Sequence, residues 1–339
     1  MISQTYRLFS PKQIRVDLID EQICENDVVV KPTYLSICAA DQRYYSGRRD
    51  KEVMKKKLPM ALIHEAIGEV VYDPKKEISV GTKVVMIPNT PTEKDNIIKE
   101  NYLRSSRFKS SGYDGFMRSI VVIDRNRVIP YYNIDDKNAV LLELISVAMN
   151  ALEHFTHYSH LKKQTIGIWG DGSVGFVTSL VLKYTFPNAK IVVIGAVREK
   201  LNFFQFADEA YLSNDVPDNF SVDHAFECVG GYHAEEAINQ IIDVINPEGS
   251  IALMGVSENN VALNTRMILE KGLTILGNSR SGYEDFAASI EFLNKFDKAR
   301  EYLNTIISDE VVVKSIKDIT EAFDRDSNNE FKTIMKWEI

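Results

Sequence analysis

The sequence predicts an α/β protein in which a doubly wound, parallel-sheet domain is inserted into a split β-rich domain. Three observations lead to this prediction: short β-type segments broken by turns up to about Pro130, alternating strand and helix signals from about Asn138, and a return to β-type segments after about Gly282. Alternating strands and helices are typical of a parallel sheet covered by helices. We therefore expect one domain from residues 1–142 and 284–339 and a second from residues 143–283.

The first part has the pattern of a small barrel-like β domain. Apolar or alternating runs bounded by proline and glycine predict strands there. These runs are Val28–Leu35, Ala66–Tyr72 and Lys83–Ile87.

The middle part alternates between buried strands and helices. Apolar residues at helical spacing predict a helix over Asn138–Tyr158. Short apolar runs predict strands at Ile166–Trp169, Lys190–Ile194, Ser221–Glu227, Ser250–Met254 and Leu273–Leu276. Beyond them we expect a helix over Asp285–Lys295, strand residues Val311–Val313 and a closing strand at Ile334–Trp337.

Composition excludes several classes of protein. No run approaches the ~20 apolar residues of a membrane span, and the N-terminus lacks a secretion signal, so a cytoplasmic protein is expected. A net charge of -8 argues against a nucleic-acid binder, which needs a basic face. The three scattered cysteines indicate reduced thiols rather than a disulfide framework.

A glycine-rich turn predicts a dinucleotide site. The strand at Ile166–Trp169 runs into Gly170-Asp171-Gly172-Ser173-Val174-Gly175, and a helix to about Lys183 follows. Gly170 and Gly172 allow a tight turn against a pyrophosphate, and Gly175 allows close packing of helix and strand. The motif occupies its required place between a strand and a helix, so we expect Ser173 and Val174 to start the helix that faces the phosphates.

The end of the next strand predicts which dinucleotide binds. An NAD site places an acidic residue about 20 residues downstream, where it accepts a hydrogen bond from the ribose, but Gly195 stands there. Arg198, with Lys200 close by, can pair with a 2′-phosphate, so NADP(H) is favoured. The alternative is that Arg198 is merely solvated and that Glu199 binds the ribose.

A second group of residues has the chemistry of a metal site. Cys38 and Asp41 lie close together, and His64 and Glu65 follow as a pair. A thiolate, an imidazole and a carboxylate are a ligand set that suits Zn²⁺. Each residue taken singly is weak support, since isolated cysteines and histidines are usually core residues.

With these motifs in this order, the whole chain resembles the medium-chain, zinc-dependent alcohol and polyol dehydrogenases. The resemblance rests on the cysteine segment, the His64-Glu65 pair, the helix that carries Glu143 and the dinucleotide turn. It implies a Rossmann domain inserted in a GroES-like catalytic domain. Within the family the chain is most similar to bacterial ribulose-5-phosphate reductases, which make ribitol 5-phosphate with NADPH for teichoic-acid or capsule synthesis.

The resemblance also implies roles for individual residues. Cys38 and His64 would be zinc ligands, Glu65 and Glu143 exchangeable carboxylate ligands, and Asp41 the carboxylate that orients His64. Cys228 and Val229 would lie beside the nicotinamide ribose, and Gly255 and Asn278, at the ends of later strands, would also contact the cofactor. We expect one glutamate to leave the metal when substrate binds, because three anionic ligands would acidify water poorly.

Two departures from the family pattern alter these expectations. Many relatives carry Ser or Thr two residues after the ligand cysteine as a proton-relay hydroxyl, whereas this chain has Ala40. The segment from Asn89 to Tyr113, where many relatives bind a structural zinc through four cysteines, contains no cysteine. We therefore expect one catalytic zinc and no structural zinc, with zinc-bound water or Glu143 serving in the relay.

The substrate end is predicted from charge. Seven basic and two acidic residues lie between Arg43 and Lys57, and the run starts five residues after Cys38. Arg43 and Arg48 could attract a phosphorylated sugar, with Tyr45 packing beside it; a solvated face and a core tyrosine are the alternatives.

The leading hypothesis is an NADPH- and zinc-dependent reductase of ribulose 5-phosphate. The alternatives are a polyol dehydrogenase for an unphosphorylated sugar alcohol and a non-catalytic NADPH-binding protein on the same fold. The resemblance further implies a homodimer or homotetramer formed through residues 250–280, and the pathway suggests a cytidylyltransferase partner.

Overall fold

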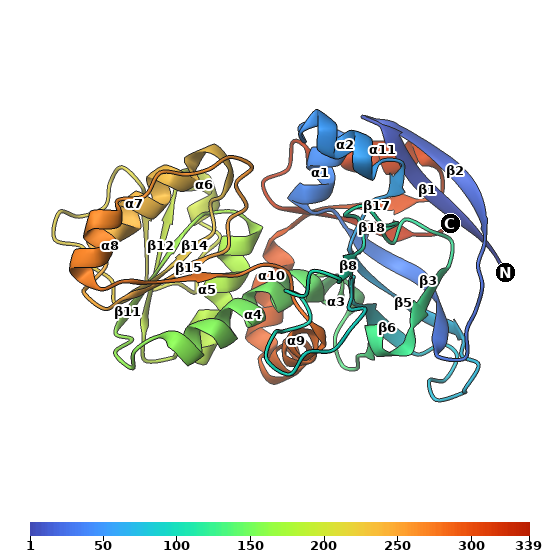
Figure 1. Cartoon of the computed structure of the whole chain (residues 1–339), viewed down its shortest axis with the longest axis horizontal. Helices are drawn as coiled ribbons and strands as arrows, with labels where there is room; N and C mark the ends of the chain where they lie inside the picture. Colours follow the sequence, from blue (N-terminus) through green and yellow to red (C-terminus); the bar gives the residue numbers. More distant parts are fainter. The chain divides into compact units, whose positions relative to one another are not determined.

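The computed structural model describes residues 1–339, which form two compact units (Figure 1). One unit comprises Met1–Ser146 and Ser281–Ile339, and the other comprises Val147–Arg280. The chain therefore leaves the first unit once and returns to it. No helix is long and apolar enough to span a membrane.

The first unit is built on a seven-stranded sheet that combines both ends of the chain. Its strand order is β10-β6-β5-β3-β18-β17, and β9 also pairs with β3. Figure 1 shows the C-terminal strands β17 and β18 beside β3 from the N-terminal part. The strands are β3 (Asp27–Ser36), β5 (Glu65–Tyr72), β6 (Lys83–Met86), β9 (Val121–Asp124), β10 (Val128–Pro130), β17 (Ile307–Val313) and β18 (Lys332–Trp337).

Smaller elements surround this sheet. A hairpin and a short third strand form the sheet β2-β1-β4, and a two-stranded ribbon pairs β7 with β8. These strands are β1 (Ile2–Ser10), β2 (Gln13–Asp20), β4 (Met60–Ala61), β7 (Asn89–Thr90) and β8 (Arg107–Phe108). The helices are α1 (Ala39–Tyr45), α2 (Lys51–Lys57), the 3-10 turn η1 (Arg125–Arg127), α3 (Asp136–Ala139), α9 (Tyr283–Lys295), α10 (Asp297–Thr305) and α11 (Ile316–Asp326).

Strand β3 shows how the sequence of the first unit specifies its core. Val28, Val29 and Val30 are fully buried, as expected of a strand covered on both faces. Pro32 has no N–H to donate, and the pairing with β5 shifts register between Pro32 and Tyr34. The predicted strands at Val28–Leu35, Ala66–Tyr72 and Lys83–Ile87 are confirmed within two residues at each end.

The second unit is a six-stranded parallel sheet with the order β13-β12-β11-β14-β15-β16. Strands β12 and β13 are added on one side of β11, and strands β14, β15 and β16 are added on the other side. This change of side is typical of doubly wound dinucleotide-binding domains. The strands are β11 (Thr165–Trp169), β12 (Lys190–Gly195), β13 (Glu209–Leu212), β14 (His224–Glu227), β15 (Ser250–Leu253) and β16 (Thr274–Gly277). The helices are α5 (Ser173–Thr185), α6 (Arg198–Leu201), the 3-10 turn η2 (Gly231–His233), α7 (Ala234–Val244) and α8 (Thr265–Lys271), while α4 (Leu142–Tyr158) begins in the first unit and continues in this one.

Two apolar cores lie on opposite faces of this parallel sheet. One contains Ile238, Ile241 and Ile242 of α7, and the other contains Phe155 of α4 and Leu182 of α5. Helices therefore cover both faces, and the predicted fold class is confirmed. The helix predicted over Asn138–Tyr158 is in fact two helices, α3 and α4, because the chain turns between Val140 and Leu142.

Candidate active site

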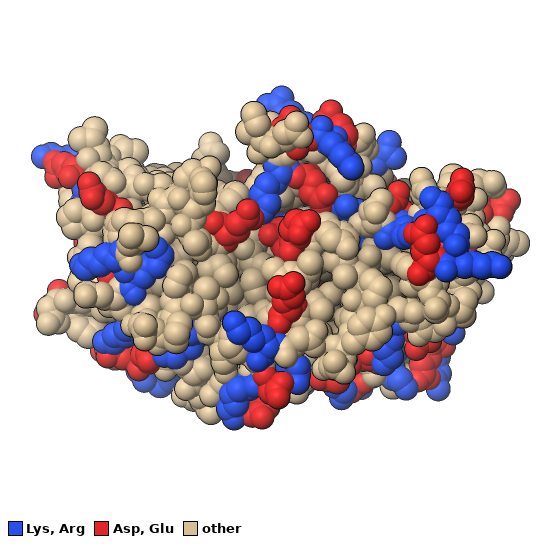
Figure 2. Space-filling view, turned by 90° about the horizontal axis from the view of Figure 1, so that it is seen from below, with Lys and Arg blue, Asp and Glu red and all other residues tan.

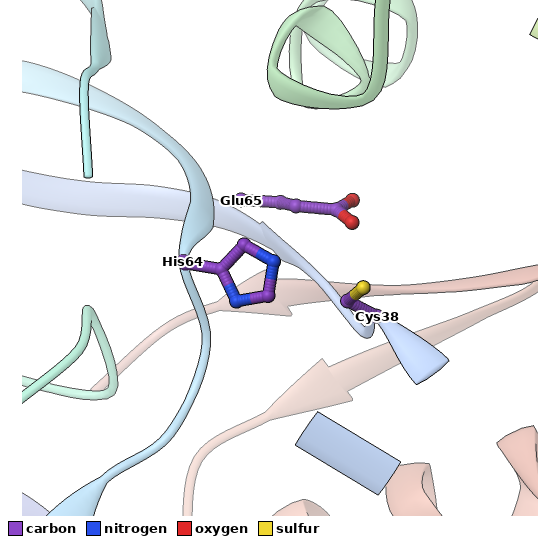
Figure 3. A group of neighbouring side chains, drawn as sticks. All are labelled: Cys38, His64 and Glu65. Carbon is purple, nitrogen blue, oxygen red and sulfur yellow. The ribbon is translucent and has the colours of Figure 1, made fainter. Parts of the chain in front are cut away.

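The register of β3 and β5 brings the predicted metal ligands together. Ser36, the last residue of β3, pairs with Glu65, the first residue of β5, so Cys38 and His64 lie just beyond the paired ends of the two strands. The ligand atoms of Cys38, His64 and Glu65 all lie within 4.8 Å of one another. Figure 3 shows the thiol, the imidazole and the carboxylate pointing toward a common space.

Asp41 contacts His64, the histidine that the family resemblance implies it orients. The carboxylate is fully buried in the first turn of α1, and its Oδ2 lies 3.3 Å from the Nδ1 of His64. Nδ1 faces this carboxylate, so Nε2 is the ring nitrogen that remains for a metal. Burial alone would raise the pKa of Asp41, but the charge of His64 and the hydrogen bonds to the carboxylate lower it.

The same carboxylate holds the strained backbone next to His64. Ile63 has a φ of +71°, which is unfavourable for a β-branched residue. Its amide donates to Oδ1 of Asp41 at 3.0 Å, and the hydroxyl of Ser110 donates to the same oxygen. Asp41 therefore positions both the ring of His64 and the turn that carries it.

Glu65 is paired with a lysine that the sequence analysis missed. The Nζ of Lys332 lies 2.7 Å from Oε2 and 2.8 Å from Oε1 of Glu65, and it also donates to the carbonyl of Ile37 at 2.7 Å. Both side chains are buried. Burial alone would lower the pKa of Lys332, but the negative charges of Glu65 and Cys38 raise it.

Lys332 reaches the site through strand pairing across the whole length of the chain. Ile334 of β18 pairs with Ser36 of β3, so Lys332 lies level with Cys38. The only hint in the sequence is a lysine at the start of a largely apolar strand. A lysine in such a place has to find a counter-charge if the strand is buried.

Glu143 is buried at the start of α4 but does not join the close group of ligand atoms. Burial raises the pKa of Glu143 to about 7, while the nearby His64 opposes the shift and Glu65 adds to it. The carboxylate is thus within electrostatic reach of the predicted ligands.

The donor set fits a zinc ion. One sulfur, one nitrogen and one carboxylate oxygen converge, and the histidine carries the buried carboxylate partner that zinc-bound histidines commonly have. Burial alone would lower the pKa of His64, but the negative charges of Asp41 and Cys38 raise it well above its usual value.

The predicted dinucleotide turn lies at the carboxyl ends of β11, β12 and β14. A pocket of about 240 Å³ opens there and is lined by Trp169–Gly172, Ile194–Ala196, Ser213, Cys228, Val229, His233, Glu236, Ala237 and Gln240. This is the place where the strand order reverses and where such sheets bind nucleotides.

The glycines of the turn have the predicted geometry. Gly170 has a φ of +128°, and a Cβ at Gly175 would lie 1.9 Å from the carbonyl oxygen of Gly170. A Cβ at Gly172 would meet nothing within 4 Å, so this position faces open space. Ser173 and Val174 begin α5, which follows the turn directly.

Only some of the remaining predicted cofactor residues line the nucleotide pocket. Cys228 and Val229 line the pocket, but Gly255, Asn278, Arg198 and Lys200 do not. Burial raises the pKa of the Cys228 thiol, which makes it a poor nucleophile. Arg198 is exposed, and its guanidinium lies 3.8 Å from Asp215, a loose contact that leaves it available to an anion.

The predicted substrate residues differ from one another in burial and in their contacts. Tyr45 is buried and stacks on Phe323 with ring centroids 4.4 Å apart, so it contributes to the core. Arg48 is exposed, and the Nε of Arg43 is buried without a hydrogen-bond partner. On the face shown in Figure 2, basic and acidic side chains are interspersed, so that face presents no continuous basic field.

Comparisons with known proteins agree with this geometry. Residues 24–133 match the family model of the alcohol dehydrogenase GroES-like domain, and residues 136–337 match that of the glucose dehydrogenase C-terminus. Ribulose-5-phosphate reductase of Bacillus spizizenii is 50% identical, and ribulose-5-phosphate reductase 2 of Staphylococcus aureus is 49% identical, each over 100% of both chains.

A solved structure agrees over the same length. The crystal structure of S. aureus TarJ in complex with NADPH matches with a TM-score of 0.89 and 42% identity, covering 100% of both chains. The convergent Cys38, His64 and Glu65, the nucleotide pocket and these full-length similarities together show that the chain belongs to the medium-chain dehydrogenase family, in the branch that contains the ribulose-5-phosphate reductases.

Proposed function

We propose that the protein reduces ribulose 5-phosphate to ribitol 5-phosphate with NADPH at one catalytic zinc. The observation that carries the proposal is the intact, convergent donor set of Cys38, His64 and Glu65 in a chain half identical to ribulose-5-phosphate reductases. The first unit would be the catalytic domain, and the second unit, with its nucleotide pocket, would bind NADP(H).

Cys38, His64 and Glu65 would hold the zinc, and Glu143 would be a second, exchangeable carboxylate. A zinc ion held there would polarise a ketone and stabilise negative charge on its oxygen. NADPH would supply hydride from C4 of its nicotinamide to the ketone carbon, and the oxygen would take up a proton by way of Glu143 or water, which leaves the alcohol and NADP⁺. Asp41 would keep the His64 ring in one orientation, and Lys332 would hold Glu65 in place through their ion pair.

The phosphate of the substrate would be bound by basic side chains that follow Cys38. Arg43 supports this proposal because its Nε makes no hydrogen bond within the protein, which leaves the guanidinium charge for an anionic ligand. Arg48 is exposed and would help to attract the anion. We also propose that the protein forms a homo-oligomer and that a cytidylyltransferase partner consumes the product.

The test is NADPH oxidation by zinc-analysed protein with ribulose 5-phosphate, with ribulose and with NADH as the alternative cofactor. We expect turnover that requires the phosphate and prefers NADPH. Cys38→Ala should lose both zinc and turnover, while Cys24→Ala, which replaces an exposed cysteine, should retain both. Turnover of ribulose at an equal rate would favour an unphosphorylated polyol substrate, and bound NADPH without turnover of any ketose would contradict an enzymatic function.

A further inference from the structure

The acidic residue within the glycine-rich turn forms a bridge to the end of the neighbouring strand. Asp171 lies between Gly170 and Gly172, and its Oδ2 accepts hydrogen bonds from the amides of Ala196 and Val197, both at 2.7 Å. These two amides belong to the turn that joins β12 to α6. Asp171 and Ala196 both line the nucleotide pocket.

Asp171 also explains why a glycine occupies position 195. A Cβ built on Gly195 would lie 2.7 Å from the Cβ of Asp171, 2.8 Å from its Oδ2 and 2.8 Å from Leu201. Real Cβ atoms do not approach other atoms this closely, so no side chain fits while Asp171 keeps this conformation. Position 195 is where an NAD site would carry its ribose-binding carboxylate.

The bridge also determines which hydrogen-bond donors are free to bind a phosphate. The amides of Ala196 and Val197 already donate to a carboxylate, so they are not free to donate to an anionic ligand. Recognition of a 2′-phosphate then depends on the side chains that follow, of which Arg198 is exposed and only loosely paired. Fixing the turn fixes the start of α6, where Arg198 is the first residue.

We propose that Asp171 is a positioning residue that sets the preference for NADPH over NADH. Its carboxylate excludes a ribose-binding side chain at position 195 and holds the turn that presents Arg198 to the 2′-phosphate. This inference rests on the proposed use of NADPH and names the residue pair that produces it. Asp171 acts through the turn and not by contact with the phosphate.

The test compares the affinities of NADPH and NADH in the absence of substrate, by cofactor fluorescence, for the wild type, Asp171→Ala, Asp171→Asn and Arg198→Ala. Asp171→Ala should weaken NADPH binding at least about tenfold, because two charge-assisted hydrogen bonds are lost, and should affect NADH less. Asp171→Asn keeps an oxygen for the two amides and should retain most of the preference. Arg198→Ala should lose the preference, and the double variant Asp171→Ala/Arg198→Ala should lose little more.

Two results would overturn the inference. An unchanged NADPH-to-NADH affinity ratio in Asp171→Ala would show that the bridge does not matter for the choice. Tighter NADPH binding by Asp171→Asn would show that the carboxylate repels the phosphate, and this result decides the question even if Asp171→Ala does not fold. A wild type that prefers NADH would instead contradict the proposed function itself, so the two failures are distinguishable.

Discussion

Lys332 shows how one buried charge shapes the candidate metal site. Its ammonium contacts both carboxylate oxygens of Glu65, so a side chain in the predicted ligand set is also half of an ion pair. Removing one partner of a buried pair leaves the other charge uncompensated and typically costs about 3 to 5 kcal/mol. A metal ion next to Glu65 could supply the missing positive charge.

Lys332→Met should therefore lower kcat at least about tenfold while the protein still retains zinc, because Glu65 without its counter-charge would bind the metal more tightly and exchange less readily for substrate. Lys332→Arg, which can still pair with a carboxylate, should recover part of kcat. The measurements are kcat, KM, zinc content, and thermal unfolding with and without a chelator. An unchanged kcat in zinc-loaded Lys332→Met would show that the pair serves folding alone.

His224 is a buried histidine whose protonation affects the stability of the folded state rather than catalysis. Burial lowers the pKa of His224 to about 4, and the nearby His160 and Lys163 contribute in the same direction, while Asp223 opposes them. Both ring nitrogens have partners: Nε2 contacts the carbonyl of Lys162, and Nδ1 accepts from the amide of Ser250. The native state therefore favours neutral His224.

The protein should lose stability as the pH falls from about 6.5 to about 4, because only the unfolded state binds a proton at His224 in this range. The contribution is about 3 to 4 kcal/mol, because the pKa falls from 6.5 to about 4 and each pKa unit corresponds to roughly 1.4 kcal/mol. Unfolding midpoints of the wild type and of His224→Gln should therefore converge toward low pH. If the difference between the two proteins stays constant from pH 7 to pH 5, His224 does not titrate as expected.

At the scale of elements, apolar runs made the buried strands predictable. The strands predicted at Ile166–Trp169, Lys190–Ile194 and Ser250–Met254 are confirmed within one residue at each end. The strands β2 and β13 were not predicted, because neither contains a run of buried apolar residues.

Two glycines of the glycine-rich turn are expected to have different roles, one in packing and one in cofactor binding. At Gly175 a Cβ would collide with backbone, whereas at Gly172 it would meet nothing, and Gly172 has a φ of -88° that alanine can adopt. Gly175→Ala should therefore destabilise the fold by about 1 to 3 kcal/mol or more, since α5 has to move away from β11. Gly172→Ala should fold normally but bind NADPH more weakly, because the new methyl group lies where the pyrophosphate approaches.

Thermal unfolding and NADPH fluorescence titration of the two variants provide the check. Two results would contradict the assignment: a Gly172→Ala variant with wild-type NADPH affinity, or a Gly175→Ala variant with wild-type stability.

At the scale of the whole molecule, the sequence motifs predicted where the candidate site lies but not all of the residues that surround it. The order of Cys38, His64 and Glu65, with a dinucleotide turn following, led to the prediction of a metal centre, and the ligand atoms of these residues lie within 4.8 Å of one another. Lys332 was not predictable, since it is 267 residues from Glu65 and meets it only through the pairing of β18 with β3. Pairing between distant strands follows from the assembled sheet and leaves no local signal.

The two units divide the predicted chemistry between them. Cys38, His64 and Glu65 all belong to the unit that contains both chain ends, whereas every residue that lines the nucleotide pocket belongs to Val147–Arg280. The two sites share no residue, so we expect zinc and NADPH to bind largely independently of each other.

Removal of zinc with a chelator should therefore abolish turnover but leave the affinity for NADPH within about twofold of the value for the zinc-loaded protein. The measurement is a fluorescence titration of NADPH against zinc-depleted protein, with protein to which zinc has been restored as the control for irreversible damage. Zinc restoration should return turnover without changing NADPH affinity. If depletion weakens NADPH binding tenfold and restoration reverses the loss, the metal and nucleotide sites are energetically coupled, and the second unit does not bind the cofactor independently of the metal.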